Sequence, residues 1–186
     1  PRALEYYNKS LNVLQLLGSK DGIASAMNSM AYLHINQGDS AKALEYYLES
    51  ADRQTDPAKK AKALYSIGKS YQDKGSLSNA RKFYLQAVEA QPSFGVVYLK
   101  IAGMYADSAN NCGNSVFEKR AVYWKAAEMA ARAGQIDPSL STTANKAAAA
   151  YRGLAPDRTM IFNENMAGKR INFSCWIGGG VTVPSL

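Results

Sequence analysis

Apolar residues recur along most of the chain at the three- and four-residue spacing of amphipathic helices. The first such segment spans residues 3–17, and its apolar face carries Leu4, Tyr7, Leu11, Leu14 and Leu17. The same spacing predicts helices over about residues 23–36, 40–52, 77–90 and 117–135, one that begins at Asp56 or Pro57, one that carries residues 98–105, and a last one that ends by Gly153. Candidate N-caps are Asp39 or Ser40 for the third helix and Ser139 or Ser141 for the last.

These predicted helices form internal repeats. Residues Met27, Met30, Ala31, His34 and Gly38 precede Leu64, Ile67, Gly68, Tyr71 and Gly75 by 37 positions each. Residues 3–7 (Ala-Leu-Glu-Tyr-Tyr) recur as residues 43–47, and Tyr98, Ile101, Ala102 and Tyr105 follow the central segment by 34 positions. Self-similarity at a period of roughly 20–50 residues is typical of stacked helical arrays.

The central segment, Ala61 to Phe94, resembles the tetratricopeptide repeat (TPR) family. Against the pattern W-x2-L-G-x2-Y…A-x3-F…P, the residues are Leu64, Ile67, Gly68, Tyr71, Ala80, Tyr84 and Pro92. The resemblance implies an all-α solenoid of antiparallel helix pairs that binds another protein. We expect a solenoid over residues 1–156, with a partial first repeat, about three full repeats and a capping helix. Pro1 falls inside a second-type helix, which predicts that the chain is a fragment of a longer protein.

Two segments depart from the repeat pattern. Residues 107–116 are rich in Asn, Ser, Gly and Asp, and they predict a loop inserted into the fourth repeat. In the extension, residues 157–186, alternating apolar residues flank Gly178–Gly180 and predict a β-hairpin that lies against the helices or pairs with Met160–Phe162. The extension is weakly similar to that of some bacterial TPR proteins, many of them associated with the cell envelope.

The TPR resemblance also implies a peptide-binding groove lined by the first helix of each repeat. Carried over by register, its principal residues are Asn28, Tyr32, Asn36, Lys62, Tyr65, Lys69, Gln72, Leu99, Lys100 and Lys146. Amides can bond a peptide backbone, tyrosines can cover its side chains, and lysines can bind its carboxylates. Asn28, Lys62 and Lys69 resemble part of the carboxylate clamp of chaperone-binding members, but Tyr32 interrupts it. The set is therefore incomplete.

Little in the sequence supports catalysis or metal binding. His34 is the only histidine, and its position in the repeat predicts a packing role. Neither a zinc-ligand pattern nor a pairing of His34 with a nearby cysteine is present, so we expect no enzyme, no metal site and no cofactor. We also expect no transmembrane segment, because no run of about eighteen apolar residues occurs.

The two cysteines leave two interpretations open. Cys112 lies in the inserted loop and Cys175 in the predicted hairpin, so a disulfide could link these segments in an oxidising compartment. The alternative is two unrelated thiols, one of them buried. The first interpretation, with the bacterial resemblance, favours the periplasm or cell envelope over the cytoplasm.

Net charge is +7 and is uneven, since residues 1–57 carry −2 and residues 58–110 carry +5. No stripe of basic and aromatic residues indicates nucleic-acid binding. The leading hypothesis is a non-catalytic scaffold or adaptor that binds a peptide or helix of another protein. An acidic peptide is one candidate partner. The alternatives are a structural module of a bacterial envelope assembly, acting through the inserted loop and hairpin, and a sensor segment of a larger protein.

Overall fold

The computed structural model describes residues 2–186 and divides the chain into two compact units. The first unit is Pro1–Pro92 and the second is Ser93–Leu186. The division falls between the second helix of one repeat and the first helix of the next. The C-terminal extension therefore belongs to the second unit, together with the fourth repeat and the capping helix.

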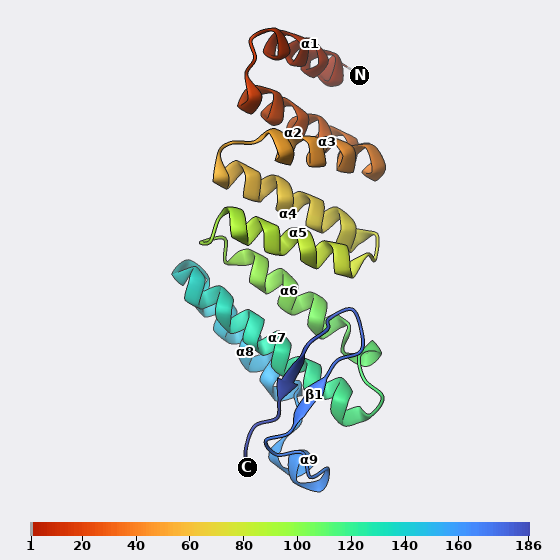
Figure 1. The fold of residues 1–186 in the computed structure, drawn as a ribbon, viewed down its shortest axis with the longest axis vertical. Coiled ribbons are helices and arrows are strands. Elements are labelled where there is room, and N and C mark those ends of the chain that lie inside the picture. Colours follow the sequence, from red (N-terminus) through yellow and green to blue (C-terminus); the bar gives the residue numbers. More distant parts are fainter. Residues whose placement is uncertain (1) are drawn as a thin grey trace. The chain divides into compact units, whose positions relative to one another are not determined.

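The first unit is a row of helices in which each packs against the next along the chain (Figure 1). They are α1 (Arg2–Leu16), α2 (Lys20–Asn36), α3 (Ser40–Arg53), α4 (Pro57–Asp73) and α5 (Leu77–Ala90). Each connection is three residues long. Connections this short make neighbouring helices antiparallel.

Polar caps decide where these helices begin. Ser19 Oγ accepts a hydrogen bond from the Gly22 backbone N–H at 3.3 Å, so α2 starts at Lys20. The prediction of a start near Ile23 is wrong because Gly22 lies in the first turn of the helix and not in the preceding loop. The equivalent caps of α3 and α4 are Asp39 and Asp56, of which Asp39 was predicted as a cap.

Small residues allow the helices of the first unit to approach closely. A Cβ added to Gly68 would lie 2.5 Å from Cδ1 of Tyr84, whose ring is fully buried. Alanines occupy the other contact positions, and those with no exposed surface are Ala24, Ala31, Ala43, Ala61, Ala80 and Ala87. The core therefore depends on close backbone approach around a few large side chains.

The second unit combines helices with a short hairpin. Its elements are α6 (Val96–Asp107), the 3₁₀ turn η1 (Ala109–Asn111), α7 (Val116–Ile136), the 3₁₀ turn η2 (Pro138–Leu140), α8 (Ser141–Leu154), α9 (Arg158–Asn163), β1 (Arg170–Asn172) and β2 (Gly180–Thr182). The strands are antiparallel, with Ile171 opposite Val181.

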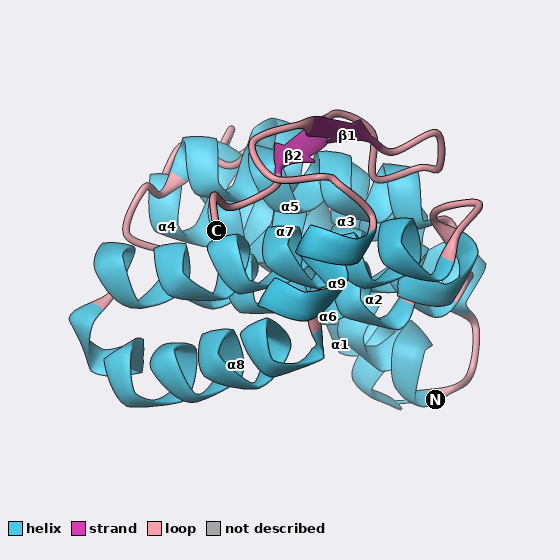
Figure 2. Cartoon of the chain, turned by 90° about the horizontal axis from the view of Figure 1, so that it is seen from below, coloured by secondary structure: helices cyan, strands magenta, loops and turns pink. Residues whose placement is uncertain are grey.

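Helix α7 is the centre of this unit. It contacts α6, α8 and β2, and Figure 2 shows the strands on one side of α7 and α8 on the other. Ala102 of α6, Ala130 of α7 and Ala148 of α8 form a buried cluster, against which Leu99 and Tyr151 pack. The hairpin adds the buried side chains of Ile171, Phe173, Ile177, Val181 and Val183.

One local prediction in the second unit is wrong, and one of the two alternatives for the hairpin is excluded. Neither Ser139 nor Ser141 caps α8 through its side chain, because the Ser139 hydroxyl bonds to Asp137 and Ser141 is already the first helical residue. The alternative strand at Met160–Phe162 is the helix α9, capped by Asp157. The hairpin accordingly lies against α7 instead of pairing with that segment.

The fold class is all-α, built from stacked helix pairs, with a small C-terminal β-hairpin, as the sequence predicts. Within residues 2–186, none of the helices combines the length and the apolar character required to cross a lipid bilayer.

Candidate functional site

Three adjoining hollows follow the face of the first unit that α2 and α4 present, and we name them together the α2–α4 groove. Their volumes are about 220, 410 and 250 Å³. The first and second share Asn28 and Ser29, and the second and third share Tyr32, Tyr47 and Ser66. Because neighbouring hollows share lining residues, the three adjoin one another along this face.

Tyrosine side chains form the middle of this groove. Tyr32 projects from α2 and is 60 % exposed, whereas Tyr47 of α3 is buried beneath it. Burial raises the pKa of Tyr47, and a hydrogen bond with Ser66 of α4 partly opposes that shift. Burial also raises the pKa of Tyr65, whose ring centroid lies 5.4 Å from that of Tyr84. The phenols of Tyr47 and Tyr65 are therefore neutral hydroxyls at physiological pH. The exposed ring of Tyr32 can offer an aromatic face to a ligand.

Cationic side chains lie towards both ends of the groove. Lys59 and Lys62 line the hollow that contains Ser25, while Lys69 lines the opposite hollow together with Asp73. Lys62 and Lys69 are exposed, and neither has a carboxylate within 4.0 Å among the residues that the structure describes. Their ammonium groups are thus available to an acidic ligand.

The structure brings together five of the predicted groove residues. Asn28, Tyr32, Lys62, Tyr65 and Lys69 all line the α2–α4 groove. Sequence reasoning left Tyr7 and Tyr47 out of the set, because both lie on second-type helices, which the family pattern assigns to packing. Both are large side chains that face the first helix of a neighbouring repeat, and this position could have indicated that they line the groove.

The remaining predicted groove residues lie elsewhere. Asn36 is exposed near the end of α2, and Gln72 accepts a hydrogen bond from the Tyr84 hydroxyl at 2.7 Å within its own repeat. Leu99 packs on the alanine cluster of the second unit, where Lys100 and Lys146 are exposed. None of these five residues lines the three hollows.

His34 is a packing residue, in agreement with its place in the repeat. It is 9 % exposed, and its ring stacks on Tyr46 with centroids 5.5 Å apart. Its Nδ1 lies 3.7 Å from a carboxylate oxygen of Asp39 and has no hydrogen-bond partner among the residues that the structure describes. Across residues 2–186, no group of three or more His, Cys, Asp or Glu side chains is arranged to hold a metal ion.

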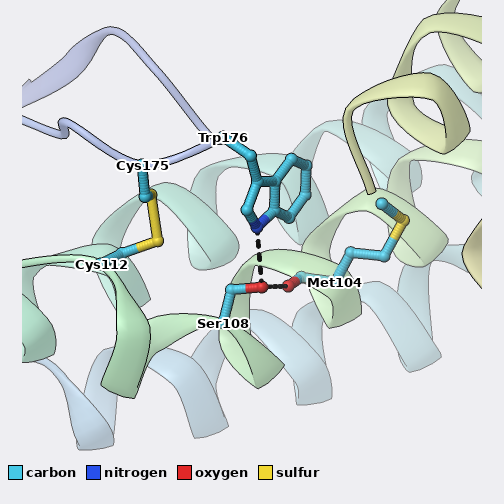
Figure 3. The surroundings of a disulfide bond; sticks show 5 residues. All are labelled: Met104, Ser108, Cys112, Cys175 and Trp176. Carbon is cyan, nitrogen blue, oxygen red and sulfur yellow. Dashed lines mark hydrogen bonds between the residues drawn. A yellow bond between two sulfur atoms is a disulfide. The ribbon is translucent and has the colours of Figure 1, made fainter. Parts of the chain in front are cut away.

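Cys112 and Cys175 are joined in a disulfide that fixes the hairpin to the inserted loop (Figure 3). Cys112 has no exposed surface. Beside the bond, Trp176 Nε1 donates to Ser108 Oγ at 3.0 Å, and that hydroxyl donates to the Met104 carbonyl at 2.9 Å. The indole also lies against Tyr105. The disulfide thus holds this segment to Cys112, directly after η1, and the hydrogen bond of Trp176 holds it to Ser108, directly after α6.

Residues 24–56 and 61–94 match the family model described as tetratricopeptide repeat. These two segments are therefore similar to tetratricopeptide repeats. The two matched repeats correspond to the helix pairs α2–α3 and α4–α5, which supply most of the groove.

Named relatives agree with this assignment. The chain is 28 % identical to the photosystem I assembly protein Ycf3 of Cuscuta gronovii over 118 residues, which are 59 % of this chain and 69 % of the relative. It is 30 % identical to the Ycf3 protein of Rippkaea orientalis over 98 residues, 48 % of this chain and 57 % of the relative. The relatives' names describe assembly and not a catalysed reaction. The repeats and the relatives together indicate a non-enzymatic protein that interacts with other proteins.

Proposed function

We propose that this chain is a binding scaffold that holds an extended peptide segment of another protein in the α2–α4 groove. The observation that carries the proposal is the adjacency of the three hollows, which combine tyrosine rings with lysines that have no carboxylate partner among residues 2–186. An extended segment suits a depression that is long, shallow and open.

The lining favours a peptide with acidic character. Lys62 and Lys69 supply positive charge towards opposite ends, and Asn28 supplies an amide that can bond a peptide backbone. Tyr32 and Tyr65 offer apolar faces between those charges. A peptide with acidic residues flanking an apolar or aromatic centre matches this order of groups along the groove.

The name of the relatives suggests that such binding serves the assembly of a protein complex. Proteins named for the assembly of photosystem I are 28 and 30 % identical to this chain over 59 and 48 % of its length. We extend the assembly role to this chain: the groove holds an exposed segment of a subunit until that subunit is built into its complex. Reversible binding is sufficient for such a role.

A selection with random peptides tests the groove. A displayed library of twelve-residue peptides is selected on the purified chain, and the best peptide is synthesised with a fluorescent label. We expect enrichment of Asp and Glu beside apolar residues. Replacing Tyr65→Ala together with Lys69→Ala should lower the affinity of the chain for that peptide by about tenfold or more. This corresponds to a loss of roughly 1.4 kcal/mol or more, as expected at a binding hot spot.

The matched control is Tyr6→Ala with Lys42→Ala, which removes the same two residue types from exposed positions of the first unit outside the groove. Its affinity for the labelled peptide should equal that of the unchanged chain. Equal affinity of all three proteins would overturn the groove proposal.

A second candidate surface is the inserted loop beside the disulfide. The disulfide holds this loop and the hairpin together, and it supports a location in an oxidising compartment such as the periplasm. If the selected peptide instead loses affinity with Asn110→Ala and Asn114→Ala, two exposed positions of the loop, the binding surface is the loop and the envelope-module hypothesis is favoured.

A further inference from the structure

A separate hollow lies along α7 in the second unit, and we name it the α7 hollow. Its volume is about 700 Å³, within the usual range of ligand sites. Trp124, Glu128, Arg132 and Gln135 project into it from successive turns of α7. Arg152 of α8 and Pro184, which follows β2, complete its edges. Neither the repeats nor the α2–α4 groove accounts for this constellation.

Two permanently charged guanidinium groups line the α7 hollow without an acidic partner. Arg132 lies over the ring of Tyr98, 4.8 Å from its centroid, which restricts its orientation while leaving its N–H groups to a ligand. Arg152 is exposed in the last turn of α8. In the part of the chain that the structure describes, neither arginine has a carboxylate within 4.0 Å.

The two cations lie at different heights along α7. Arg120 of α7 donates to the carbonyls of Leu154 and Ala155, so the C-terminal end of α8, and Arg152 with it, lies near the Trp124 end of the hollow. Arg132 follows Trp124 by eight residues, or about 12 Å of helix at 1.5 Å per residue. Glu128 stands midway between these two levels.

This spacing matches a short extended peptide. A strand advances about 3.3 Å per residue and sends alternate side chains to the same side. Residues i and i+4 are therefore about 13 Å apart and face the same way, with residue i+2 between them. Carboxylates at i and i+4 would meet the two arginines, and residue i+2 would face Glu128, which disfavours a third acid and attracts a base.

We propose that the α7 hollow is a second binding site, for an extended segment of a partner protein with acidic residues four positions apart and a basic or uncharged residue midway. Trp124 and Pro184 supply the apolar contact. The site is independent of the α2–α4 groove, since all of its residues belong to the second unit.

The two tryptophans of the chain can serve as the probe and the control in one binding experiment. They are Trp124, in the α7 hollow, and Trp176, whose indole N–H is bonded to Ser108. The ¹⁵N-labelled chain is titrated with the synthetic peptide acetyl-Gly-Glu-Ala-Lys-Ala-Glu-Gly-amide while both indole N–H signals are followed by NMR. We expect the Trp124 signal to move and saturate while the Trp176 signal stays in place.

Variants identify the groups that recognise the peptide. Arg152→Ala should weaken binding by about fivefold or more, the loss of one charge-assisted contact of roughly 1 kcal/mol, with an unchanged circular dichroism spectrum. Glu128→Gln should remove the preference for Lys over Glu at the centre of the peptide. The groove variant Tyr65→Ala with Lys69→Ala should bind this peptide with the affinity of the unchanged chain. The two proposals can therefore fail independently of each other.

Three results would overturn the inference. They are a Trp124 signal that does not move, an equal response to the peptide in which both Glu residues are Gln, and an unchanged affinity of the Arg152→Ala chain.

Discussion

Gly68 shows how one missing side chain determines the packing of a repeat. The ring of Tyr84 fills the space where a Cβ would be, with Cδ1 and Cε1 only 2.5 and 2.7 Å from that position. Tyr84 is fully buried, and its hydroxyl is bonded to Gln72 on the same helix as Gly68. The ring therefore has little freedom to move away.

We expect Gly68→Ala to destabilise the first unit by about 1–3 kcal/mol, the usual cost of overpacking a well-filled core. Gly103→Ala is the matched control, because a Cβ at this helical position meets nothing within 4 Å. There the replacement should stabilise α6 by about 0.5–1 kcal/mol. Urea denaturation followed by far-UV circular dichroism measures both. An unchanged midpoint for Gly68→Ala would contradict this account of the packing.

Asp21 and Thr55 join the start of α2 to the linker before α4. The Asp21 carboxylate accepts bonds from the Thr55 hydroxyl at 2.6 and 2.7 Å and from its backbone N–H at 3.0 Å. These bonds favour the ionised form, so the pKa of Asp21 is lowered from its ordinary value of 3.8. The stabilisation is present above pH 3.8 and is lost as the pH falls through the lowered pKa.

Thr55→Val should accordingly raise the pKa of Asp21 towards its ordinary value, since the hydroxyl donor is removed and the backbone donor remains. Titration of the Asp21 carboxyl carbon by NMR gives this pKa directly. The stability difference between the two proteins should be constant near neutral pH and shrink in acid. Thr55→Ser keeps the hydroxyl and should titrate like the unchanged chain. Identical titration of Thr55→Val would remove the hydroxyl as the cause.

Among the elements, the end of α8 depends on a side chain from another helix. Arg120 Nε donates to the Leu154 carbonyl at 2.8 Å, and Nη2 donates to the Ala155 carbonyl at 3.0 Å. Carbonyls at a helix C-terminus lack intrahelical donors, and a cation there also suits the helix dipole. The guanidinium also reaches Met160 in α9, so one residue organises the corner between the two helices.

Replacing Arg120→Leu should destabilise the second unit by about 1.5–3 kcal/mol, the range for hydrogen bonds that involve a charged group. Amide hydrogen exchange should accelerate first over residues 152–163. Lys119→Ala removes a neighbouring charge and should leave exchange in that segment unchanged. A uniform acceleration through all of α7 and α8 would instead indicate that Arg120 supports the core and not the corner.

Helical periodicity predicted every long helix. The errors occurred at short segments where a polar capping residue determines whether and where a helix begins. The predicted start near Ile23 left Gly22 outside α2, yet the Ser19 cap includes it in the first turn of that helix. Residues 160–162 are apolar enough for a strand, and only the cap at Asp157 selects the helix α9. Both outcomes depend on single hydrogen bonds, which a pattern of apolar residues does not encode.

Register along the first helices placed half of the predicted groove residues in the α2–α4 groove, and their role in binding stays a prediction. Tyr32, Tyr65 and Lys69 line the groove because each repeats a known position on a matched helix. It placed Leu99 on the same face, but the neighbouring alanine cluster draws that side chain into the core. The α7 hollow was not anticipated, because Trp124 and Arg132 lie on a second helix, where the repeat pattern specifies packing alone.

At the scale of the whole molecule, the disulfide makes the fold of the second unit depend on the redox state of the compartment. We expect no free thiol in protein purified from its native compartment, with thiols trapped at lysis and counted under denaturing conditions. This result requires an oxidising location. Two free thiols per chain would instead indicate a reducing compartment and remove the proposal of a periplasmic or envelope location.

The disulfide also changes how the molecule would carry a mechanical load. Cys112 and Cys175 are 63 positions apart, and the loop they close contains α7, α8, α9 and β1. A pull applied at the two chain ends would pass through the sulfur atoms and bypass everything inside that loop. At about 3.4 Å per residue, oxidation withholds roughly 210 Å of extension. The same polypeptide is therefore a shorter tether when oxidised than when reduced, and the helices inside the loop bear none of the tension.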